Sequence, residues 1–136
     1  MLFRSAVVPS LLRAFEPQIL VTQCGADTHH EDPLAELSLT VDGHRAIYRA
    51  CRDLATEYAG GKWLALGGGG YNLFRGVPRS WTHLLATVLD RDVDPDRTIP
   101  AEWMSHAATL TNRPLDRKST RLNSSHSGES RMPSSA

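Results

Sequence analysis

A cluster of metal-binding residue types occupies the segment CGADTHHEDP, residues 24–33. Carboxylates are hard oxygen ligands and imidazole is a borderline nitrogen ligand, a combination that suits zinc or a similar divalent cation. The side chains that could bind such an ion are Asp27, His29, Glu31 and Asp32. The two aspartates could instead cap turns or the start of the next helix. The segment alone therefore leaves metal binding and turn capping open.

A run of four glycines followed by a tyrosine forms the second unusual segment, LGGGGYN at residues 66–72. Consecutive glycines cost conformational entropy, so they indicate positive φ angles or a close approach of the backbone to another group. A dinucleotide-binding loop that began at Gly67 would need glycine where Asn72 stands, and a phosphate-binding loop would need a Gly-Lys pair that does not follow. The spacing excludes both loops. Tyr71 is either a core aromatic residue or an exposed phenol donor, and its place directly after the glycines favours the donor.

Both segments follow stretches that the sequence pattern predicts to be strands of a parallel sheet. The apolar residues of these stretches are consecutive, as expected for strands covered on both faces. The expected elements are a helix over 3–15, a strand over 18–25, a helix from about 40 to 58, a strand from 62 into the glycine run, and a helix over 81–89. This order predicts a right-handed parallel α/β arrangement. Both segments then lie at the carboxyl edge of the sheet, where open α/β sheets bind ligands.

The remaining residues of chemical interest have simpler interpretations. His44 and His83 fall in predicted helices and are expected to be surface or hydrogen-bonded core residues. The three tryptophans are attributed to packing. Aspartates alternate after the last predicted helix, at positions 90, 92, 94 and 96, where Pro95 and the missing glycine turn argue against a calcium loop. We expect these aspartates to form a solvated connection.

The composition indicates a small domain followed by a tail of different character. The chain has 136 residues, of which 40% are hydrophobic, enough for one core of modest size. Residues 116–136 are serine-rich, with only Leu122 and Met132 as large apolar side chains, so we expect this tail to be disordered. The tail also resembles the in-frame translation of a sequencing-library adapter. The folded region is expected to span residues 1–115, and the natural protein to continue differently after Leu115.

Charge and hydropathy narrow the expected partners and location. Without the tail the chain has 11 Lys/Arg and 13 Asp/Glu residues, a balance that argues against a nucleic-acid-binding surface. No apolar run approaches the length of a membrane span. Cys24 and Cys51 fall in a predicted strand end and a predicted helix, which fits a reduced setting better than a disulfide framework. We therefore expect a cytoplasmic protein with neither nucleic acid nor membrane as a partner.

Two long segments resemble the zinc-dependent histone deacetylase superfamily, most closely its bacterial acetoin-utilisation branch. They are PQILVTQCGADTHHEDPLAELSLTVDGH and LALGGGGYNLFRGVPRSWTHL, in that order. The resemblance covers about residues 3–104 and includes the VDPDRTIPAEW segment typical of that branch. It implies the C-terminal part of a three-layer α/β domain of the arginase–deacetylase type, with a parallel sheet and an active site built from loops.

The resemblance also implies roles for particular residues. Asp27 would be a metal ligand, and Tyr71 would donate a hydrogen bond to the substrate carbonyl. Leu34 would form a wall of the narrow acyl-lysine tunnel, and Gly69 and Gly70 would let the backbone approach its floor. The implied cofactor is zinc or another divalent metal such as iron. The implied substrate is an acetylated lysine, with acetyl-CoA synthetase as the target suggested by the acetoin-utilisation branch.

The resemblance is incomplete, because the superfamily's other metal ligands and its adjacent His-His general acid–base pair have no counterpart in this chain. His29 and His30 occupy positions that vary in the superfamily. Without the missing groups the fragment is expected to be inactive. Two alternatives remain open at this point: a non-catalytic module that binds an acyl or amine ligand, and a related binuclear ureohydrolase, in which Tyr71 would have no role.

Overall fold

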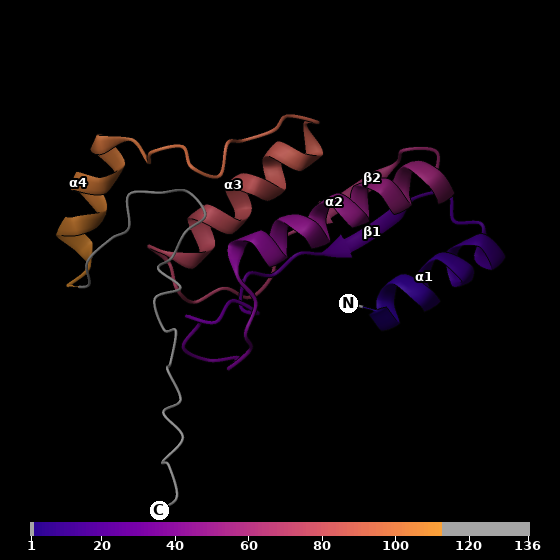
Figure 1. Ribbon diagram of the computed structural model, residues 1–136, viewed down its shortest axis with the longest axis horizontal. Helices are drawn as coiled ribbons and strands as arrows, with labels where there is room; N and C mark the ends of the chain where they lie inside the picture. Colours follow the sequence, from indigo (N-terminus) through magenta and orange to yellow (C-terminus); the bar gives the residue numbers. More distant parts are fainter. Residues whose placement is uncertain (1, 113–136) are drawn as a thin grey trace, which may run out of the picture.

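Two parallel strands and the helix that connects them form the centre of the computed structural model, which describes residues 2–112. The tail expected to be disordered lies outside the described residues. In chain order the elements are α1 Leu2–Phe15, β1 Leu20–Gln23, α2 Val41–Tyr58, β2 Trp63–Leu66, α3 Gly76–Val88 and α4 Ala101–Leu110 (Figure 1). The mixed helix and strand content confirms the α/β class.

The strands pair in parallel from Leu20 opposite Trp63 to Gln23 opposite Leu66. Both strands therefore end at the same edge of the sheet, as the order of elements predicts. Each strand has four residues, and the glycines that follow β2 lie outside it. The predicted strands were longer because glycine and cysteine at their ends fit either a strand or the loop that follows.

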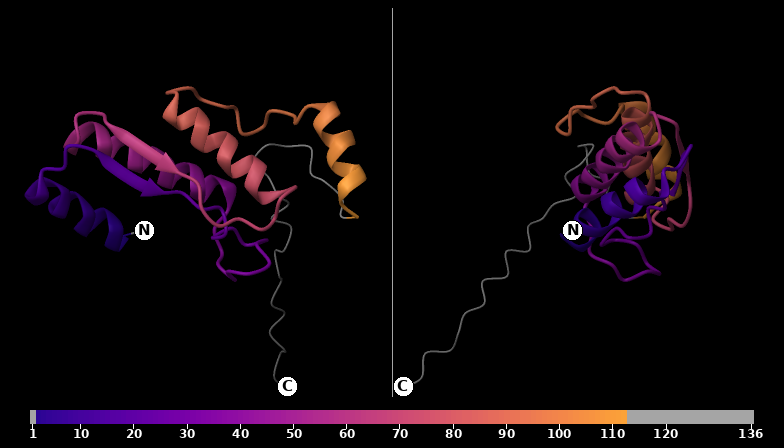
Figure 2. Two further views of the ribbon diagram at one scale, coloured as in Figure 1. Left: turned by 180° about the vertical axis from the view of Figure 1, so that it is seen from behind. Right: turned by 90° about the vertical axis from the view of Figure 1, so that its right-hand side faces the viewer.

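One face of the sheet is covered by helices α2 and α3. Cys24, Tyr48 and Leu84 form the buried apolar cluster, and Trp63, Ala65 and Trp81 pack against it. The opposite face is open within residues 2–112: Val21, Leu64 and Leu66 are 46–52% exposed, and no helix lies in front of the strands from that side (Figure 2, left). The expectation that both faces are covered is therefore met on one face only, because α2 and α3 pack on the same side.

Local capping signals fix the ends of α2. The Thr40 side chain accepts a hydrogen bond from the Gly43 N–H at 3.1 Å, and Asp42 lies in the positively polarised first turn. At the other end Gly60 and Gly61 have φ angles of 58° and 77°, which glycine adopts without strain. The predicted start near residue 40 and the glycine stop are both confirmed.

The other helices match the sequence pattern less closely. Helix α1 ends before Pro17 as predicted, but Leu11 and Phe15 of its apolar stripe are 61% and 80% exposed. Helix α3 begins at Gly76, five residues earlier than expected, because the Gly76 and Val77 N–H groups donate to the Asn72 carbonyl and start the helix there. Helix α4 was not predicted, and its only buried residue is Ala107.

Two further expectations concern the tryptophans, which were attributed to packing, and the cysteines, which fit a reduced setting better than a disulfide framework. Trp63 and Trp81 pack against the core as expected, and their indoles donate to Thr22 Oγ1 and to the Cys24 carbonyl. Trp103 differs from the expectation, because it is 37% exposed. Both cysteines are free thiols. Among residues 2–112, no helix combines the length and the apolar character that crossing a bilayer requires.

Candidate active site

The two unusual segments come together at the carboxyl edge of the sheet. The Cys24 N–H donates to the Leu66 carbonyl at 2.8 Å, which continues the strand pairing by one residue. The Ala26 N–H then donates to the Gly69 carbonyl at 2.6 Å. These bonds carry the pairing of the strands into the loops, so that the residues after Ala26 run beside the glycine run.

Asp27 and the glycine run are in direct contact. A Cβ atom placed on Gly69 would overlap the Asp27 carboxylate, so only glycine allows the backbone to lie this close. A Cβ atom on Gly70 would lie 2.7 Å from Val77 Cγ2 and 3.3 Å from Ala26 Cβ. Close approach to the Asp27 segment and to α3 therefore explains why glycine stands at both positions.

The Asp32 carboxylate connects Tyr71 to Leu34. One of its oxygens accepts from the Tyr71 N–H at 2.8 Å, and the other accepts from the Leu34 and Ala35 N–H groups at 3.0 and 3.3 Å. Burial raises the pKa of Asp32, but the three backbone donors, Tyr71 first, outweigh it and hold the pKa below its ordinary value. Asp32 thus caps a turn, as one interpretation of the segment allowed, and the sequence gave no signal for its bond to Tyr71.

A second link between the loops involves Glu31 and Arg75. Arg75 Nη2 and Nε donate to the two Glu31 carboxylate oxygens at 2.8 and 3.1 Å, the two-pronged geometry that makes arginine–carboxylate pairs strong. Both side chains are only 20–25% exposed. The Asn72 side chain also donates to the Glu31 carbonyl at 3.1 Å. Tyr71 is therefore held on both sides by bonds to the segment 24–33.

The predicted substrate-binding side chains at this edge are exposed. Tyr71 is 51% exposed and Leu34 is 66% exposed, although the backbone of each is fixed by Asp32. Asp27 is half-buried. The structure therefore brings the five predicted site residues to one edge of the sheet in two groups: Asp27 with the two glycines, and Tyr71 with Leu34.

His44 anchors the segment 24–33 to the helices through a buried chain of hydrogen bonds. His44 Nε2 shares a hydrogen bond of 2.7 Å with Thr28 Oγ1, and His44 Nδ1 shares one of 2.8 Å with Ser80 Oγ. Ser80 Oγ in turn lies 2.6 Å from the Tyr48 hydroxyl. Burial lowers the pKa of His44, with the Asp27 charge acting in the opposite direction. His44 is thus the hydrogen-bonded core residue that its helical position predicted.

His29 is buried beside this chain and is not paired at both ring nitrogens. Its Nδ1 accepts from the Glu31 N–H at 3.2 Å, whereas its Nε2 has no hydrogen-bond partner among the described residues. Burial, followed by the charges of His30 and His44, lowers the pKa of His29 to about 4. The ring is therefore neutral at pH 7 and packs against Gly76 of α3.

The described residues do not form a complete metal site. A zinc site takes at least three protein ligands, and within residues 2–112 no three His, Cys, Asp or Glu side chains converge on a point. Asp27 is the single carboxylate in the position that the resemblance implies. Any metal bound at this edge would need ligands from outside these residues.

Comparison with known proteins supports the family resemblance of the two segments. The sequence model of the histone deacetylase domain matches residues 1–88. The acetoin utilization protein AcuC of Bacillus subtilis (strain 168) is 44% identical over 90 residues, which are 66% of this chain and 23% of that protein. AcuC of Staphylococcus xylosus is 33% identical over 103 residues, covering 76% of this chain and 26% of that protein. The chain thus spans about a quarter of the length of these relatives.

Solved structures agree in fold. The crystal structure of the HDA15 HD domain matches with a TM-score of 0.53 and 30% identity, over 63% of this chain and 24% of that one. The histone deacetylase Clr3 matches with a TM-score of 0.56 over 79% of this chain and 18% of that one, and at 19% identity this likeness concerns the fold alone. Because the domain model covers more than half of the chain, the chain belongs to the histone deacetylase family, and its resemblance to AcuC is confirmed.

Proposed function

We propose that this chain forms one side of the active site of a metal-dependent deacetylase that hydrolyses acetyl-lysine. The contact between the Asp27 carboxylate and Gly69, two residues before Tyr71, is the observation that carries this proposal. It places a carboxylate and a phenol-bearing loop at the same edge of the sheet, although they are 44 positions apart in the sequence. Parallel α/β sheets bind their ligands at this edge.

Each predicted residue has a role in the proposed site. The Tyr71 phenol donates to the substrate carbonyl and to the oxyanion that develops from it, a contribution of about 10²- to 10³-fold in rate. Leu34 lines the acyl-lysine tunnel, and Gly69 and Gly70 allow the backbone to approach its floor. Asp32 fixes the backbone of Tyr71 relative to that of Leu34, and so positions the phenol relative to the tunnel wall.

The metal in this proposal is zinc or another divalent ion such as iron, and Asp27 is one of its ligands. When bound, such an ion polarises a carbonyl and makes a water molecule a better nucleophile. The remaining ligands and the general base lie outside the described residues. The 136-residue chain alone is therefore expected to be inactive, and measurable turnover by the purified chain would contradict this part of the proposal.

The proposed substrate class follows from the relatives. The relatives from Bacillus subtilis and Staphylococcus xylosus that align with this chain are acetoin utilization proteins AcuC. We take an acetylated lysine as the reacting group and acetyl-CoA synthetase as the candidate protein that bears it. Incubating acetylated synthetase with a complete enzyme that contains this segment, and following loss of the acetyl group by mass spectrometry, tests that choice.

The role of Tyr71 can be tested in a chimera in which residues 1–104 replace the matching segment of the Bacillus subtilis AcuC protein. Tyr71→Phe should lower kcat on an acetyl-lysine peptide by about 10²-fold or more while the metal content stays constant. Tyr58→Phe is the matched control, because Tyr58 lies at the end of α2 and contacts Arg13. Near-normal turnover by Tyr71→Phe would refute the assigned role.

The role of Asp27 is tested in the same chimera by measuring how much metal the protein binds. Asp27→Asn should lower the bound metal measured by elemental analysis, whereas Asp53→Asn, at an exposed position on α2, should not. If the chimera binds an acetylated peptide but never turns it over, the segment is a binding module and the catalytic proposal fails.

A further inference from the structure

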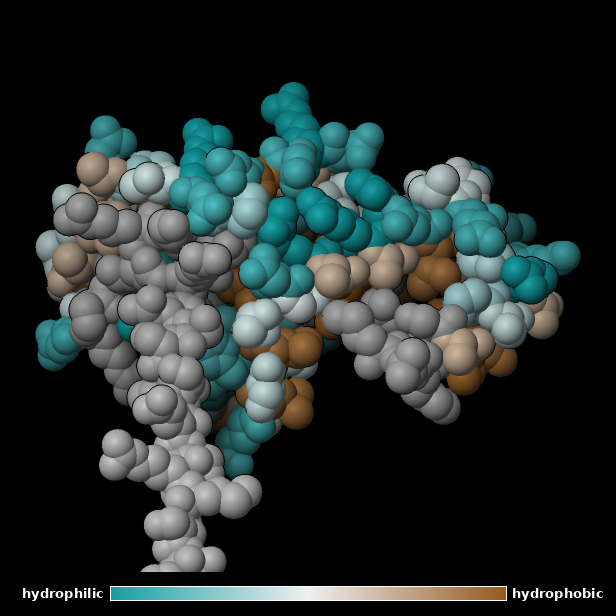
Figure 3. Space-filling model, in the orientation of Figure 1, coloured by the Kyte–Doolittle hydropathy of each residue, from teal (hydrophilic) through white to brown (hydrophobic). Residues whose placement is uncertain are grey.

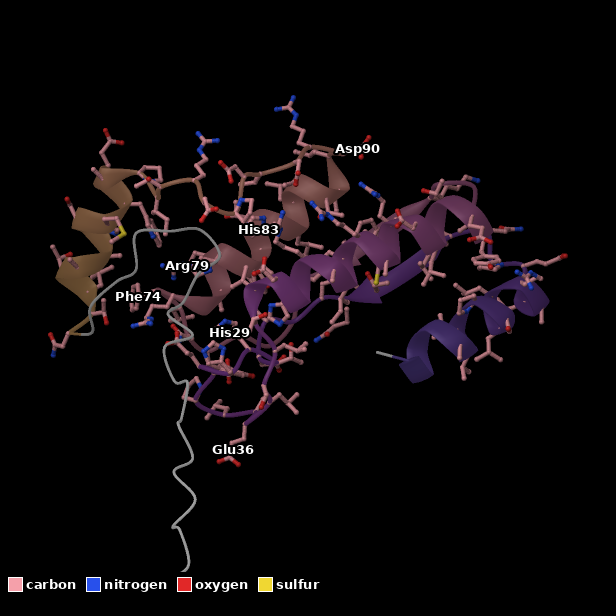
Figure 4. All side chains as sticks on the ribbon, in the orientation of Figure 1. His29, Glu36, Phe74, Arg79, His83 and Asp90 are labelled. Atoms are coloured by element: carbon pink, nitrogen blue, oxygen red, sulfur yellow. The ribbon has the colours of Figure 1, made fainter. Side chains whose placement is uncertain are left out.

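A cavity lies between α2 and the end of α3, away from the proposed active site. Its volume is about 150 Å³. His83 and Asp90 mark it in Figure 4, on the opposite side of the helices from His29 and Glu36. His83, the first residue of α3 to line the cavity, lies seven residues after Gly76 at the start of that helix, a rise of about 10 Å at 1.5 Å per residue. The surface over this part of α2 and α3 is hydrophilic (Figure 3).

Four arginines line the cavity. Three of them, Arg45, Arg49 and Arg52, follow one another on one face of α2 at helical spacing, and Arg91 comes from the segment after α3. Like charges at such spacing repel each other and destabilise a helix. Only two carboxylates line the same cavity, so its wall carries an excess of positive charge.

Four exposed carboxylates pair with three of these arginines, among them Asp42 at 3.2 Å from Arg45 and Asp53 at 3.0 Å from Arg52. Asp92 lies 2.8 Å from Arg49 and 3.5 Å from Arg45, but its side chain is 76% exposed. Asp90 lies 2.9 Å from Arg52 with its side chain 87% exposed. Exposed pairs of this kind contribute little stability. No carboxylate of the described residues pairs with Arg91.

His83 is one of the residues that line this cavity. The side chain is 2% exposed, and its Nε2 has no hydrogen-bond partner among the described residues. Buried polar atoms in native proteins nearly always have a partner, so this nitrogen requires an ordered water or a ligand that the described residues do not supply. Burial, followed by the charge of Arg45, lowers the pKa of His83 to about 4, so the ring is neutral and Nε2 can donate as an N–H group.

We propose that this cavity binds an oxyanion of the phosphate class, either inorganic phosphate or the phosphoryl group of a small metabolite. Arginine guanidinium groups match phosphate oxygens in two-pronged hydrogen bonds, and the His83 ring supplies a further donor. The volume holds one phosphoryl group and is smaller than the pockets that enclose whole drug-sized ligands. The site is separate from the proposed deacetylase site, so either proposal can fail without the other.

Isothermal titration calorimetry of the 136-residue chain with inorganic phosphate tests the site, with chloride at matched ionic strength as the reference. Saturable binding is expected, and Arg49→Gln should weaken it roughly tenfold, because a charged hydrogen bond is lost. Arg97→Gln removes the same charge from an exposed position outside this cavity and should leave the affinity unchanged. No saturable binding, or an equal loss in both variants, would overturn the proposal.

A second variant removes a negative charge instead of a positive one. It should bind phosphate more tightly, a result that a loss of folding could not produce. Asp92→Asn removes the carboxylate that pairs with Arg49 and one of the two that pair with Arg45, and it should strengthen phosphate binding, whereas Glu102→Gln on α4 should not. Equal strengthening in both would show a general charge effect and refute the site. Glycerol 3-phosphate separates the two sources: tighter binding than inorganic phosphate favours a phosphorylated metabolite, and weaker binding favours the free ion.

Discussion

Replacing Ser80 by alanine should destabilise the chain more than any other removal of one hydroxyl from α3. Ser80 is fully buried, and its Oγ lies 2.8 Å from His44 Nδ1 and 2.6 Å from the Tyr48 hydroxyl. A hydroxyl has one hydrogen, so Ser80 donates to one of these groups and accepts from the other. Alanine has almost the same shape but removes both bonds and leaves one donor and one acceptor buried without partners.

The expected cost follows from those two groups. An unsatisfied buried polar group costs about 1–3 kcal/mol, so Ser80→Ala should lower the free energy of unfolding by about 2–4 kcal/mol. Tyr48→Phe should cost only about 1 kcal/mol, because Ser80 can still donate to His44. In the double variant the Tyr48 hydroxyl is no longer left unpaired, so the double cost should be smaller than the sum of the two single costs.

Urea unfolding followed by circular dichroism measures these differences at constant m-value. Ser10→Ala on the exposed side of α1 is the matched control and should change stability by no more than about 0.5 kcal/mol. A loss below 0.5 kcal/mol in Ser80→Ala, or strict additivity in the double variant, would refute the inference that this chain of hydrogen bonds anchors the segment 24–33.

Three further predictions concern the histidine at the basic cavity and the two loops. Acidification from pH 7 to 5 should cost about 2 kcal/mol through His83, because its folded pKa of about 4 lies below the ordinary 6.5 and the unfolded chain takes up the proton first. His83→Gln should remove this share of the pH dependence of urea unfolding, while His29, whose pKa is also about 4, retains a similar share. Gly69→Ala should lower activity and metal content in the chimera at least about tenfold, whereas Gly67→Ala, whose Cβ would meet only a tryptophan ring at 3.5 Å, should leave both near normal. Asp32→Asn should speed hydrogen exchange at the Tyr71 amide and lower kcat without loss of metal, because an amide offers one acceptor oxygen where the carboxylate used two.

The parts of the fold that the sequence predicts well depend on local signals. The start of α2 at Thr40 follows from a side-chain cap, and its end follows from glycines with positive φ. The strands follow from short apolar runs, and their parallel order follows from the helix between them. The order of the elements is enough to predict that Asp27 and Tyr71 lie at the same edge of the sheet, so this could be inferred from the sequence alone.

The bonds that hold the two loops together could not be inferred in the same way. The bond from the Tyr71 N–H to Asp32 and the pair between Glu31 and Arg75 join residues about 40 positions apart. Which residues meet in these bonds depends on the strand register and on the path of each loop. Neither of these produces a periodic pattern in the sequence. Helix α4 was not predicted, although Trp103, Ala107 and Leu110 recur at helical spacing; of these three residues only Ala107 is buried.

The contact between Asp27 and Gly69 depends on a single register of the two strands. A shift of one residue would turn every strand side chain to the other face, and a shift of two would move the glycine run by about 6–7 Å relative to the carboxylate. One indole stabilises the observed register: Trp63 of β2 donates to Thr22 Oγ1 of β1 at 2.8 Å, a bond that would be lost if the strands slid. A second indole, Trp81 of α3, donates to the Cys24 carbonyl at 3.0 Å and holds the end of β1 against that helix. The packing that stabilises the sheet is therefore also what positions the carboxylate beside the glycine loop.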